Sequence, residues 1–382
     1  MAFDAIDILS IDWGVDFENI DSFMSDTDVD AVAVEECPEY KVAEVEWVDL
    51  DNYLYVEKYW DKVFDVMNRK KLSPQAYNEL QDIKCNWRDI VQEVKCGLFS
   101  WGIPHAVQIP KANGKMRTVY VFGMKQRVLL SVLNRILSDY YSAKISPVCY
   151  SYKAGVTTIS AVRDIKQGVY AGKSCTYDYG MKLDISKYFN SVSEERVKEM
   201  LEQVFAVHER GVIYELIRVL YTINYAESKG GVQQEYLSLI PGVAVSSFFA
   251  NYCLREVDEH FRLNNIVYAR YCDDIILFGK TEEDLTKSID YIVKVLRGYG
   301  LSINNDKYKS YIIEEEPIDF LGLCFDADSI DVSVESFKKM KHKIRVVCRA
   351  ARRNVELKHK TPEKEIERVI RQFNYSWFKC YI

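Results

Sequence analysis

The sequence predicts an α+β fold built around an antiparallel sheet of the split βαβ type. Short runs rich in β-branched and aromatic residues alternate with segments of helical periodicity, in the order β-α-α-β-β-α-β. One pair of these runs flanks a tight hairpin in "VYARYCDDIILFGK", residues 267–280. The chain has 382 residues and is 48% hydrophobic. It can therefore bury a substantial core and form two or three subdomains.

The front half of the chain is predicted to hold helices and one hairpin. The spacing of Leu, Val, Trp and Tyr over residues 53–97 predicts helices. "IPKANGKMRTVYVF", residues 109–122, predicts a β-hairpin that turns at Asn113-Gly114. "RVLLSVLNRILSDYY", residues 127–141, again has helical periodicity.

The middle of the chain supplies the elements of the predicted sheet. "CTYDYGMKLDISKYF", residues 175–189, predicts a strand, and "SEERVKEMLEQVF" predicts a helix that begins at the N-cap Ser193. The remaining predicted elements are a helix over 246–262, the hairpin, a helix over 281–297 and a strand over 308–313. They form the two layers of a split βαβ sheet.

Charge is distributed unevenly along the chain. Residues 1–52 carry 16 acidic side chains against the single Lys41, although the formal net charge of the whole chain is only −7. The densest basic run is residues 337–360, with ten Lys or Arg side chains opposed only by Glu356. Such a run is either a solvated helix face or a surface that follows nucleic-acid phosphates.

Composition excludes several classes of protein. We find no basic and then apolar leader typical of export, and the charge-free stretch Tyr236–Leu254 is interrupted by Pro241 and Gly242. Ten scattered cysteines without a CxxC pair predict neither a zinc site nor a disulfide framework. We therefore expect a cytoplasmic protein with reduced thiols and no membrane partner.

The adjacent carboxylates Asp273 and Asp274 at the hairpin tip predict a metal site. Neighbouring carboxylates repel each other unless a cation lies beside them, and Mg²⁺ prefers oxygen ligands. Asp184, at the end of the strand in "MKLDISKYFNSV", is the candidate third acid. If that strand lies beside the hairpin, Asp184 and Asp273 face each other across the sheet and bridge two cations. Two such ions are the arrangement for nucleotidyl transfer.

These motifs together resemble those of reverse transcriptases. The palm motifs are matched by Asp184 with Phe189, "IPGVAVSSFFANYCLREVD" (240–258), "YCDD" (271–274), "GYGLSINNDK" (298–307) and "IDFLG" (318–322). Upstream, "GKMRTVYV" (114–121) and "CYSYKAGVTTISAV" (149–162) resemble the finger motifs of the bacterial group II intron and retron enzymes. The motifs occur in the family's order, which supports the resemblance. Together they cover most of the chain.

The resemblance implies a right-hand polymerase fold with fingers, palm and a short helical thumb. On this basis residues 1–52 are an acidic N-terminal leader, and residues 53–180 hold the N-terminal helices and fingers. Residues 181–332 form the palm with the catalytic motifs, and residues 333–382 form the basic helical thumb.

The resemblance also implies the roles of the catalytic residues. Asp184 and Asp273 would hold two Mg²⁺ ions, with Mn²⁺ as an alternative, Asp274 as the neighbouring acid and the Ile185 carbonyl as a further ligand. Lys307 matches a lysine that donates a proton to the leaving pyrophosphate. Its alternative interpretation is a surface lysine.

The nucleotide and the primer are assigned in the same way. Arg117, with Lys115 or Lys111, would contact the triphosphate, because a guanidinium matches phosphate oxygens well. The two lysines are alternatively only solvated. Phe189 matches the aromatic gate that excludes a ribose 2′-hydroxyl, although an apolar residue beside a strand is more often core. The remaining predicted contacts are Tyr188 and Gly242 for the nucleotide, and Phe320, Leu321 and Gly322 for the primer grip.

The chain departs from the reverse transcriptase motifs at a few positions. These differences indicate which subgroup of the family it most resembles, and three functions stay open. Ile240-Pro241-Gly242 stands where group II intron and retron enzymes have Pro-Gln-Gly, and the retron Val-Thr-Gly signature is absent. The chain most resembles the defence-associated, abortive-infection-type reverse transcriptases. That resemblance implies an RNA-directed DNA polymerase that uses dNTPs and a dedicated noncoding RNA, as a homo-oligomer or with a partner protein. The alternatives are a template-independent or protein-primed DNA polymerase and a non-catalytic nucleic-acid-binding scaffold.

Overall fold

The computed structural model describes residues 53–70, 72–110, 116–205, 222–226, 231–236 and 239–373. The helices are α4 (Glu57–Asn68), α5 (Pro74–Lys95), α6 (Met124–Tyr140), α7 (Thr158–Val169), α8 (Tyr188–Ser191), α9 (Glu194–Val204), α11 (Ala244–Cys253), α12 (Arg255–Leu263), α13 (Glu282–Gly298), α14 (Val334–Lys358) and α15 (Pro362–Phe373). The strands are β1 (His105–Pro110), β2 (Met116–Val121), β3 (Tyr170–Ala171), β4 (Ser174–Cys175), β5 (Tyr179–Asp184), β6 (Thr222–Ala226), β7 (Val232–Tyr236), β8 (Tyr268–Tyr271), β9 (Asp274–Gly279), β10 (Lys309–Ile312), β11 (Ile318–Phe320), β12 (Leu323–Phe325) and β13 (Ile330–Val332). The predicted α+β class is confirmed.

The central sheet has the strand order β10-β5-β9-β8, and every neighbouring pair is antiparallel. This is the predicted split βαβ arrangement, with β5 and β9 in the middle. Strand alternation divides β5 between two environments. Met181 and Leu183 belong to the larger core cluster, whereas Lys182 and Asp184 point to the opposite face.

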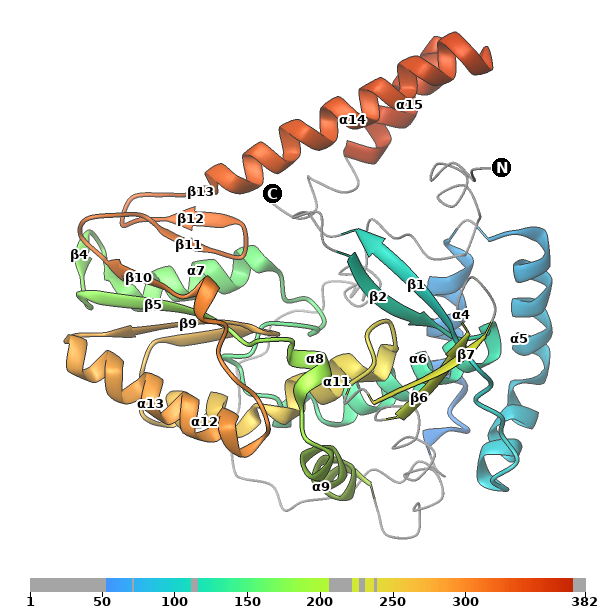
Figure 1. Cartoon of the computed structure of the whole chain (residues 1–382), viewed down its shortest axis with the longest axis horizontal. Coiled ribbons are helices and arrows are strands. Elements are labelled where there is room, and N and C mark those ends of the chain that lie inside the picture. Colours follow the sequence, from blue (N-terminus) through green and yellow to red (C-terminus); the bar gives the residue numbers. More distant parts are fainter. Residues whose placement is uncertain are drawn as a thin grey trace.

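Each face of the central sheet is covered by a different layer. Helices α12 and α13 pack along one face, as Figure 1 shows in orange and yellow. On the other face, Phe278 of β9 shares a second core cluster with Phe320 and Phe325 of the small β11-β12-β13 sheet. Helix α7 contributes Val162 and Ile165 to the same cluster. The two middle strands, β5 and β9, are thus covered on both faces.

Helix α9 begins at the predicted N-cap, but one predicted helix is divided in two. The Ser193 side chain accepts a hydrogen bond from the Arg196 N–H at the start of α9, as the sequence predicts. The single helix predicted over residues 246–262 is instead two helices, α11 and α12, which meet at Leu254. The apolar pattern does not reveal this break, because all of α11 from Val245 onward is buried and has no polar face.

A second sheet, which mixes parallel and antiparallel pairs, carries the predicted basic hairpin. Its order is β2-β1-β6-β7, in which β1 pairs antiparallel with β2 and parallel with β6, and β6 pairs antiparallel with β7. The hairpin is tied to the loop before α11, because the Tyr120 N–H donates to the Pro241 carbonyl at 3.1 Å. The tip of the hairpin, with Lys111, Lys115 and the Asn113-Gly114 turn, lies outside the described residues, as does the acidic leader.

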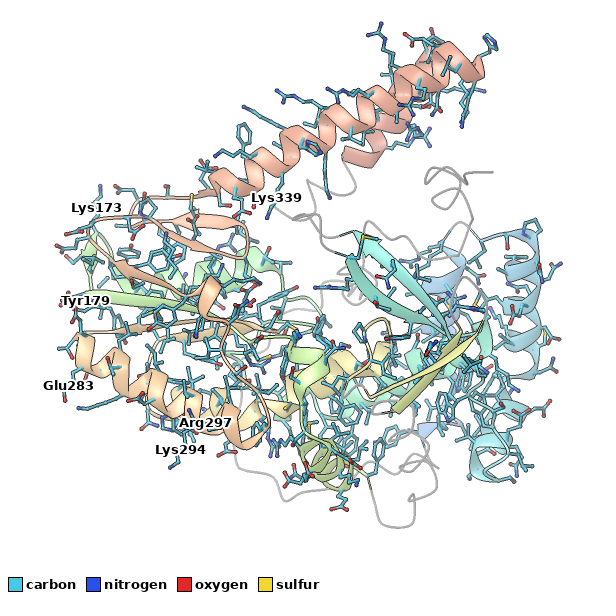
Figure 2. The ribbon with its side chains drawn as sticks, viewed as in Figure 1. Lys173, Tyr179, Glu283, Lys294, Arg297 and Lys339 are labelled. Atoms are coloured by element: carbon cyan, nitrogen blue, oxygen red, sulfur yellow. The ribbon has the colours of Figure 1, made fainter. Side chains whose placement is uncertain are left out.

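The basic run forms the long helix α14. Only Ser336 and Ala351 of this helix are buried, and side chains stand off it along its length (Figure 2, where Lys339 is labelled). Helix α14 packs against α15 and extends from the β13 end of the small sheet (Figure 1). None of the helices in the described part of the chain combines the length and apolar character needed to cross a bilayer.

Candidate active site

The three acidic residues come together where β5 ends and β9 begins. Asp184, the last residue of β5, is paired in register with Asp274, the first residue of β9. Opposite residues in an antiparallel pair point to the same face, with Cα atoms roughly 4.5–5.5 Å apart. Asp273 precedes them in the turn, where its carbonyl accepts the Ile185 N–H at 3.0 Å. The prediction that Asp184 lies opposite Asp273 is therefore corrected by one residue, since Asp274 occupies that register position.

The turn that carries Asp273 is a two-residue loop between β8 and β9. Tyr271 pairs with Asp274, which leaves Cys272 and Asp273 as the loop. Cys272 adopts a φ of +57°, a left-handed conformation that side chains with a Cβ adopt rarely. Asp273 lies outside the strand, so strand alternation does not fix its direction, and it can share the face of Asp274.

Burial and mutual repulsion raise the pKa values of the two adjacent acids. Burial raises the pKa of Asp273, and the charge of Asp184 raises it further. Burial raises the pKa of Asp274 to about 6, although the nearby Lys182 ammonium opposes the shift. Such a cluster of carboxylates gains most from a divalent cation, which removes the repulsion.

Two side chains from the segment after α13 engage Asp184. The Lys307 ammonium lies 2.7 Å from Asp184 Oδ2, and the Asn304 amide donates to Asp184 Oδ1 at 2.9 Å. The Asn304 N–H also donates to the Asp184 carbonyl at 2.7 Å. Partial burial lowers the pKa of Lys307, but the hydrogen bond to Asp184 and its charge raise the pKa overall. Sequence reasoning identified Lys307 and missed Asn304, although both lie in "GYGLSINNDK".

The donor set suits Mg²⁺ that is shared with a substrate. Within the described ranges, no three His, Cys, Asp or Glu side chains are arranged to hold a metal ion by themselves. Mg²⁺ is usually held by one or two carboxylates together with substrate phosphates and water, rather than by an all-protein cage. Asp184 and Asp274 supply hard oxygen atoms on one face of the sheet end, and Asp273 supplies a third carboxylate from the adjoining turn. These residues therefore fit Mg²⁺ ions whose remaining ligands come from a nucleotide.

Phe189 and Tyr188 follow the first acid on the short helix α8 but differ in exposure. Phe189 is half-buried, and its carbonyl accepts the Leu239 N–H at 2.7 Å. Tyr188 is buried, and its hydroxyl donates to the Ala250 carbonyl. The side chain of Tyr188 thus packs in the core, so any contact with a nucleotide comes from its backbone, whereas part of the Phe189 ring is accessible.

Gly242 and Arg117 belong to two segments that pack together. Gly242 has a φ of +93°, and a Cβ there would lie 3.3 Å from the Tyr120 carbonyl oxygen. Arg117 is exposed on the same strand as Tyr120, and its charge lowers the pKa of Asp273. Arg117 is therefore close enough to interact with the acid cluster. Lys111 and Lys115 lie outside the described residues.

The predicted primer-grip residues form the turn of a hairpin. Phe320 pairs with Leu323, and Leu321 and Gly322 between them have φ values of +51° and +80°. Two consecutive positive φ values are typical of a type I′ turn. The Gly322 carbonyl accepts the Ser333 N–H at 2.9 Å. This bond ties the turn to the N-cap of α14.

Comparison with known protein families identifies the chain. A profile described as "Reverse transcriptase (RNA-dependent DNA polymerase)" matches residues 109–325. This segment is more than half of the chain, and it contains every predicted site residue. The chain belongs to the reverse transcriptase family.

Two curated relatives support this membership. The Retron Ec48 reverse transcriptase of Escherichia coli is 24% identical over 274 residues, which are 70% of this chain and 63% of the relative. The putative COX1/OXI3 intron 1 protein of Saccharomyces cerevisiae is 22% identical over 167 residues, which are 44% of this chain and 19% of that protein. The chain thus spans less than two thirds of either relative. The predicted resemblance to reverse transcriptases of the retron and group II intron type is confirmed.

Solved structures with a similar backbone include yeast telomerases. Apo telomerase from Candida tropicalis has a TM-score of 0.49 and 13% identity, covering 70% of this chain and 54% of that chain. Telomerase from the same species in complex with a TWJ fragment of telomeric RNA has a TM-score of 0.48 and 15% identity, covering 80% of this chain and 59% of that chain. Since both TM-scores lie below 0.5, the family assignment rests on the sequence match.

Proposed function

We propose that this chain is an RNA-directed DNA polymerase that adds dNTPs to a primer 3′-hydroxyl with two Mg²⁺ ions. The observation that carries the proposal is the pairing of Asp184 with Asp274 beside the turn that holds Asp273. Segments about ninety residues apart in the sequence thereby place three carboxylates at one sheet end. Membership of the reverse transcriptase family supports nucleotidyl transfer as the reaction at this cluster.

The acids would hold the ions, and the surrounding cations would hold the nucleotide. Asp184 and Asp273 are the proposed ligands, with Asp274 beside them and the Ile185 carbonyl as a further oxygen. When bound, the two ions neutralise the triphosphate and favour ionisation of the 3′-hydroxyl. Arg117 would orient the phosphates, with Lys111 or Lys115 from the same hairpin. Mn²⁺ is an alternative ion, since it accepts the same oxygen ligands.

Lys307 is the proposed donor of a proton to the leaving pyrophosphate. Its side chain is 61% exposed, so a nucleotide can reach the ammonium, and its contact with Asp184 keeps it at the metal site. The raised pKa keeps Lys307 protonated at neutral pH, which a general acid requires before transfer.

The proposed choice of sugar depends on Phe189. The partly exposed ring follows Asp184 by five residues and lies in the short helix α8. An aromatic ring there would meet a ribose 2′-hydroxyl, which cannot hydrogen-bond to it, so deoxyribonucleotides are the expected substrates. Tyr188 and Gly242 would shape the same site through their backbones.

The primer and its template would lie along the small sheet and α14. Leu321 and Gly322 form the turn proposed to grip the primer end, with Phe320 buried beneath it. Helix α14 starts beside this turn and exposes most of its basic side chains. A basic helix in that place would follow the phosphates of the product duplex.

The proposed biological setting is a bacterial anti-phage system with a dedicated noncoding RNA. The similarity to a retron reverse transcriptase supports it. A homo-oligomer or a partner protein would complete such a system. A cytoplasmic location fits the described cysteines, all of which are free thiols.

Template-independent or protein-primed DNA synthesis is a second candidate. Pro241 stands where group II intron and retron enzymes have glutamine, and its carbonyl is engaged by the Tyr120 N–H at 3.1 Å. A proline lacks the side-chain amide that could hydrogen-bond to a base pair. The strictness of template reading is therefore the property that separates the two candidates.

A primer-extension experiment tests the proposal. The purified chain is given a DNA primer on an RNA template of defined sequence, with dNTPs or rNTPs and Mg²⁺, and the products are sequenced. We expect DNA complementary to the template, and none from the Asp273→Asn variant. Products unrelated to the template would favour the second candidate. A wild-type chain that binds RNA without extending any primer would support the scaffold interpretation and refute the proposal.

A further inference from the structure

The backbone of the metal-binding turn is held by groups outside the turn itself. The Cys272 N–H donates to Ser151 Oγ at 2.9 Å, and the Cys272 carbonyl accepts from Arg270 Nη1 at 3.3 Å. The Asp273 carbonyl accepts the Ile185 N–H. A two-residue turn with a positive φ at Cys272 is costly for a non-glycine residue, so it persists only where its surroundings fix it.

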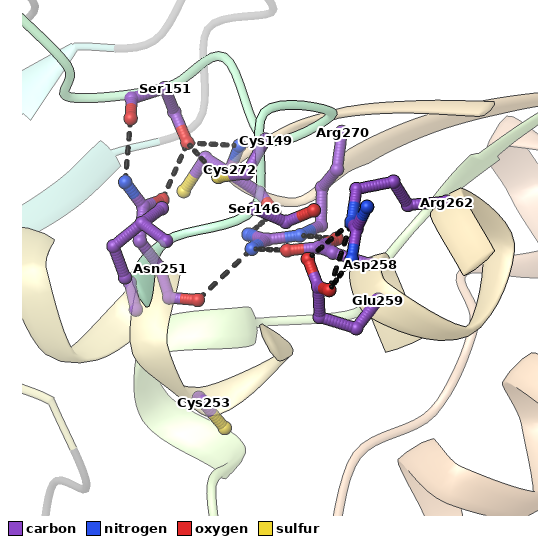
Figure 3. Close-up of polar contacts among 12 residues, drawn as sticks. Ser146, Cys149, Ser151, Asn251, Cys253, Asp258, Glu259, Arg262, Arg270 and Cys272 are labelled. Atoms are coloured by element: carbon purple, nitrogen blue, oxygen red, sulfur yellow. Dashed lines mark hydrogen bonds and ion pairs between the residues drawn. The ribbon is translucent and has the colours of Figure 1, made fainter. Parts of the chain in front are cut away.

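Arg270 is part of a buried ion pair directly beneath this turn (Figure 3). Its side chain and that of Asp258 are both 0% exposed. Arg270 Nε donates to Asp258 Oδ1 at 2.8 Å, and Nη2 donates to Asp258 Oδ2 at 2.6 Å. Nη2 also donates to the Asn251 carbonyl at 3.0 Å. Tyr268 adds a hydrogen bond to Asp258 Oδ1 at 2.9 Å. The guanidinium is thereby locked in the orientation that leaves Nη1 for Cys272.

Ser151 is locked in a similar way from the other side of the turn. Its hydroxyl donates to Asn251 Oδ1 at 2.7 Å, so its lone pair is directed to the Cys272 N–H. The Asn251 amide returns a hydrogen bond to the Ser151 carbonyl at 2.6 Å. Both side chains are buried. Asn251 thus connects the two anchors, since its carbonyl contacts Arg270 and its side chain contacts Ser151.

Stability alone is a poor reason for such an arrangement. Replacing a buried ion pair with apolar residues of similar volume is often neutral or stabilising, because the charges lose their hydration on burial. An apolar core could not reproduce one feature of this network, because Ser151 and Arg270 both hydrogen-bond to the backbone of Cys272. What they supply is a fixed position for the residue that precedes Asp273.

We propose that Asp258, Arg270, Ser151 and Asn251 form a positioning frame that holds the Cys272-Asp273 turn in its metal-binding geometry. The inference deepens the proposed function and rests on it for its catalytic consequence. None of the four side chains touches the reacting atoms in this proposal. They act through the backbone of the turn, as outer groups orient the ligands of other metal sites.

An apolar replacement of the ion pair separates positioning from stability. The variant Asp258→Leu, Tyr268→Phe, Arg270→Met removes both charges and the hydroxyl that would otherwise lose its acceptor. We expect a melting temperature near that of the wild type but a kcat lower by roughly 10- to 100-fold, with a KM for dNTP within about twofold of the wild type. We also expect Mn²⁺, followed by electron paramagnetic resonance without substrate, to bind roughly 10- to 100-fold more weakly.

A neighbouring ion pair provides the matched control. Glu259 and Arg262 lie on the same helix and are joined at 2.7 Å, but their side chains are about one third exposed and no hydrogen bond joins either to Cys272 or Asp273. The double variant Glu259→Leu, Arg262→Met should leave Mn²⁺ affinity and kcat unchanged. An equal loss in both variants would overturn the proposal, because the effect would then follow from removing any ion pair that involves α12.

A smaller variant decides the question if the apolar replacement does not fold. Ser151→Ala removes one hydroxyl, and we expect faster hydrogen exchange at the Cys272 amide together with weaker Mn²⁺ binding. Ser288→Ala is its control, because Ser288 is also buried and its hydroxyl bonds only within α13 at the Asp284 carbonyl. Wild-type exchange and Mn²⁺ affinity in Ser151→Ala would refute the frame. Hydrogen exchange and Mn²⁺ affinity can be measured even if the wild-type chain does not polymerise. A failure of the positioning frame can therefore be distinguished from a failure of the proposed function.

Discussion

Replacing Asp274 with asparagine should stabilise the metal-free protein while it removes a carboxylate from the proposed metal site. Burial raises the pKa of Asp274 to about 6, from an ordinary value near 3.8. A raised carboxyl pKa means that the folded state binds the proton more tightly than the unfolded state. Above the folded pKa the buried charge therefore destabilises the fold, and this penalty disappears as the pH falls from about 6 toward 4.

The size of the effect follows from the shift. A displacement of about two pKa units corresponds to about 3 kcal/mol at pH 7, because one unit is about 1.4 kcal/mol. In a chain of this size that gain corresponds to a rise in melting temperature of roughly 5 °C. Asparagine keeps the shape of the side chain and carries no charge, so it should recover most of this free energy at pH 7 and little of it at pH 4.

Thermal unfolding in EDTA measures the prediction. Wild type, Asp274→Asn and the control Asp290→Asn are compared from pH 4 to pH 8. Asp290 is exposed on α13, so its replacement should change the free energy of unfolding by less than about 0.5 kcal/mol. Added Mg²⁺ should stabilise wild type more than Asp274→Asn. A melting temperature of Asp274→Asn equal to or below that of the wild type at pH 7 would refute the reasoning.

Three further variants test single contacts. Phe189→Ala should reduce the preference for dNTPs over rNTPs by about 10- to 100-fold, measured as the ratio of kcat/KM values, and an unchanged ratio would exclude Phe189 as the gate. Lys307→Ala should lower kcat by about 100-fold or more, because it removes the proposed general acid, and Lys307→Arg should recover part of the loss. An Ala variant with normal kcat would assign Lys307 to the surface. Gly242→Val should destabilise the protein by about 1–3 kcal/mol, since the φ of Gly242 is +93° and the new Cβ would crowd Tyr120. The control Gly298→Val should cost about 1 kcal/mol or less, because a Cβ at Gly298 meets no atom within 4 Å. Equal losses in the two glycine variants would contradict the packing argument.

Local patterns in the sequence predicted much of the fold because they arise from local physics. The run "CTYDYGMKLDISKYF" predicted the strand that ends at Asp184, and Ser193 marked a helix start. The split βαβ order followed from the sequence of elements. Family motifs then brought Asp184, Asp273 and Lys307 to one site, where the contact of Lys307 with Asp184 agrees with that expectation.

Properties that depend on non-local contacts could not be predicted. The pairing of Asp184 with Asp274 is a matter of strand register, which a single sequence does not specify to one residue. The positioning frame joins Ser151 to Cys272 across 121 positions of sequence, and no local pattern marks that contact. Both features arise when distant elements pack together.

Cleavage by a bound redox metal tests the central claim, that segments distant in the sequence share one divalent-ion site. Fe²⁺ replaces Mg²⁺ in the purified chain, ascorbate and peroxide generate hydroxyl radicals at the ion, and the cut sites are mapped. Cuts should fall near both Asp184 and Asp273, since the β5 end and the β8–β9 turn are hydrogen-bonded neighbours, and excess Mg²⁺ should suppress both together. Cutting near one of the two segments alone, or cutting that Mg²⁺ does not suppress, would contradict the claim.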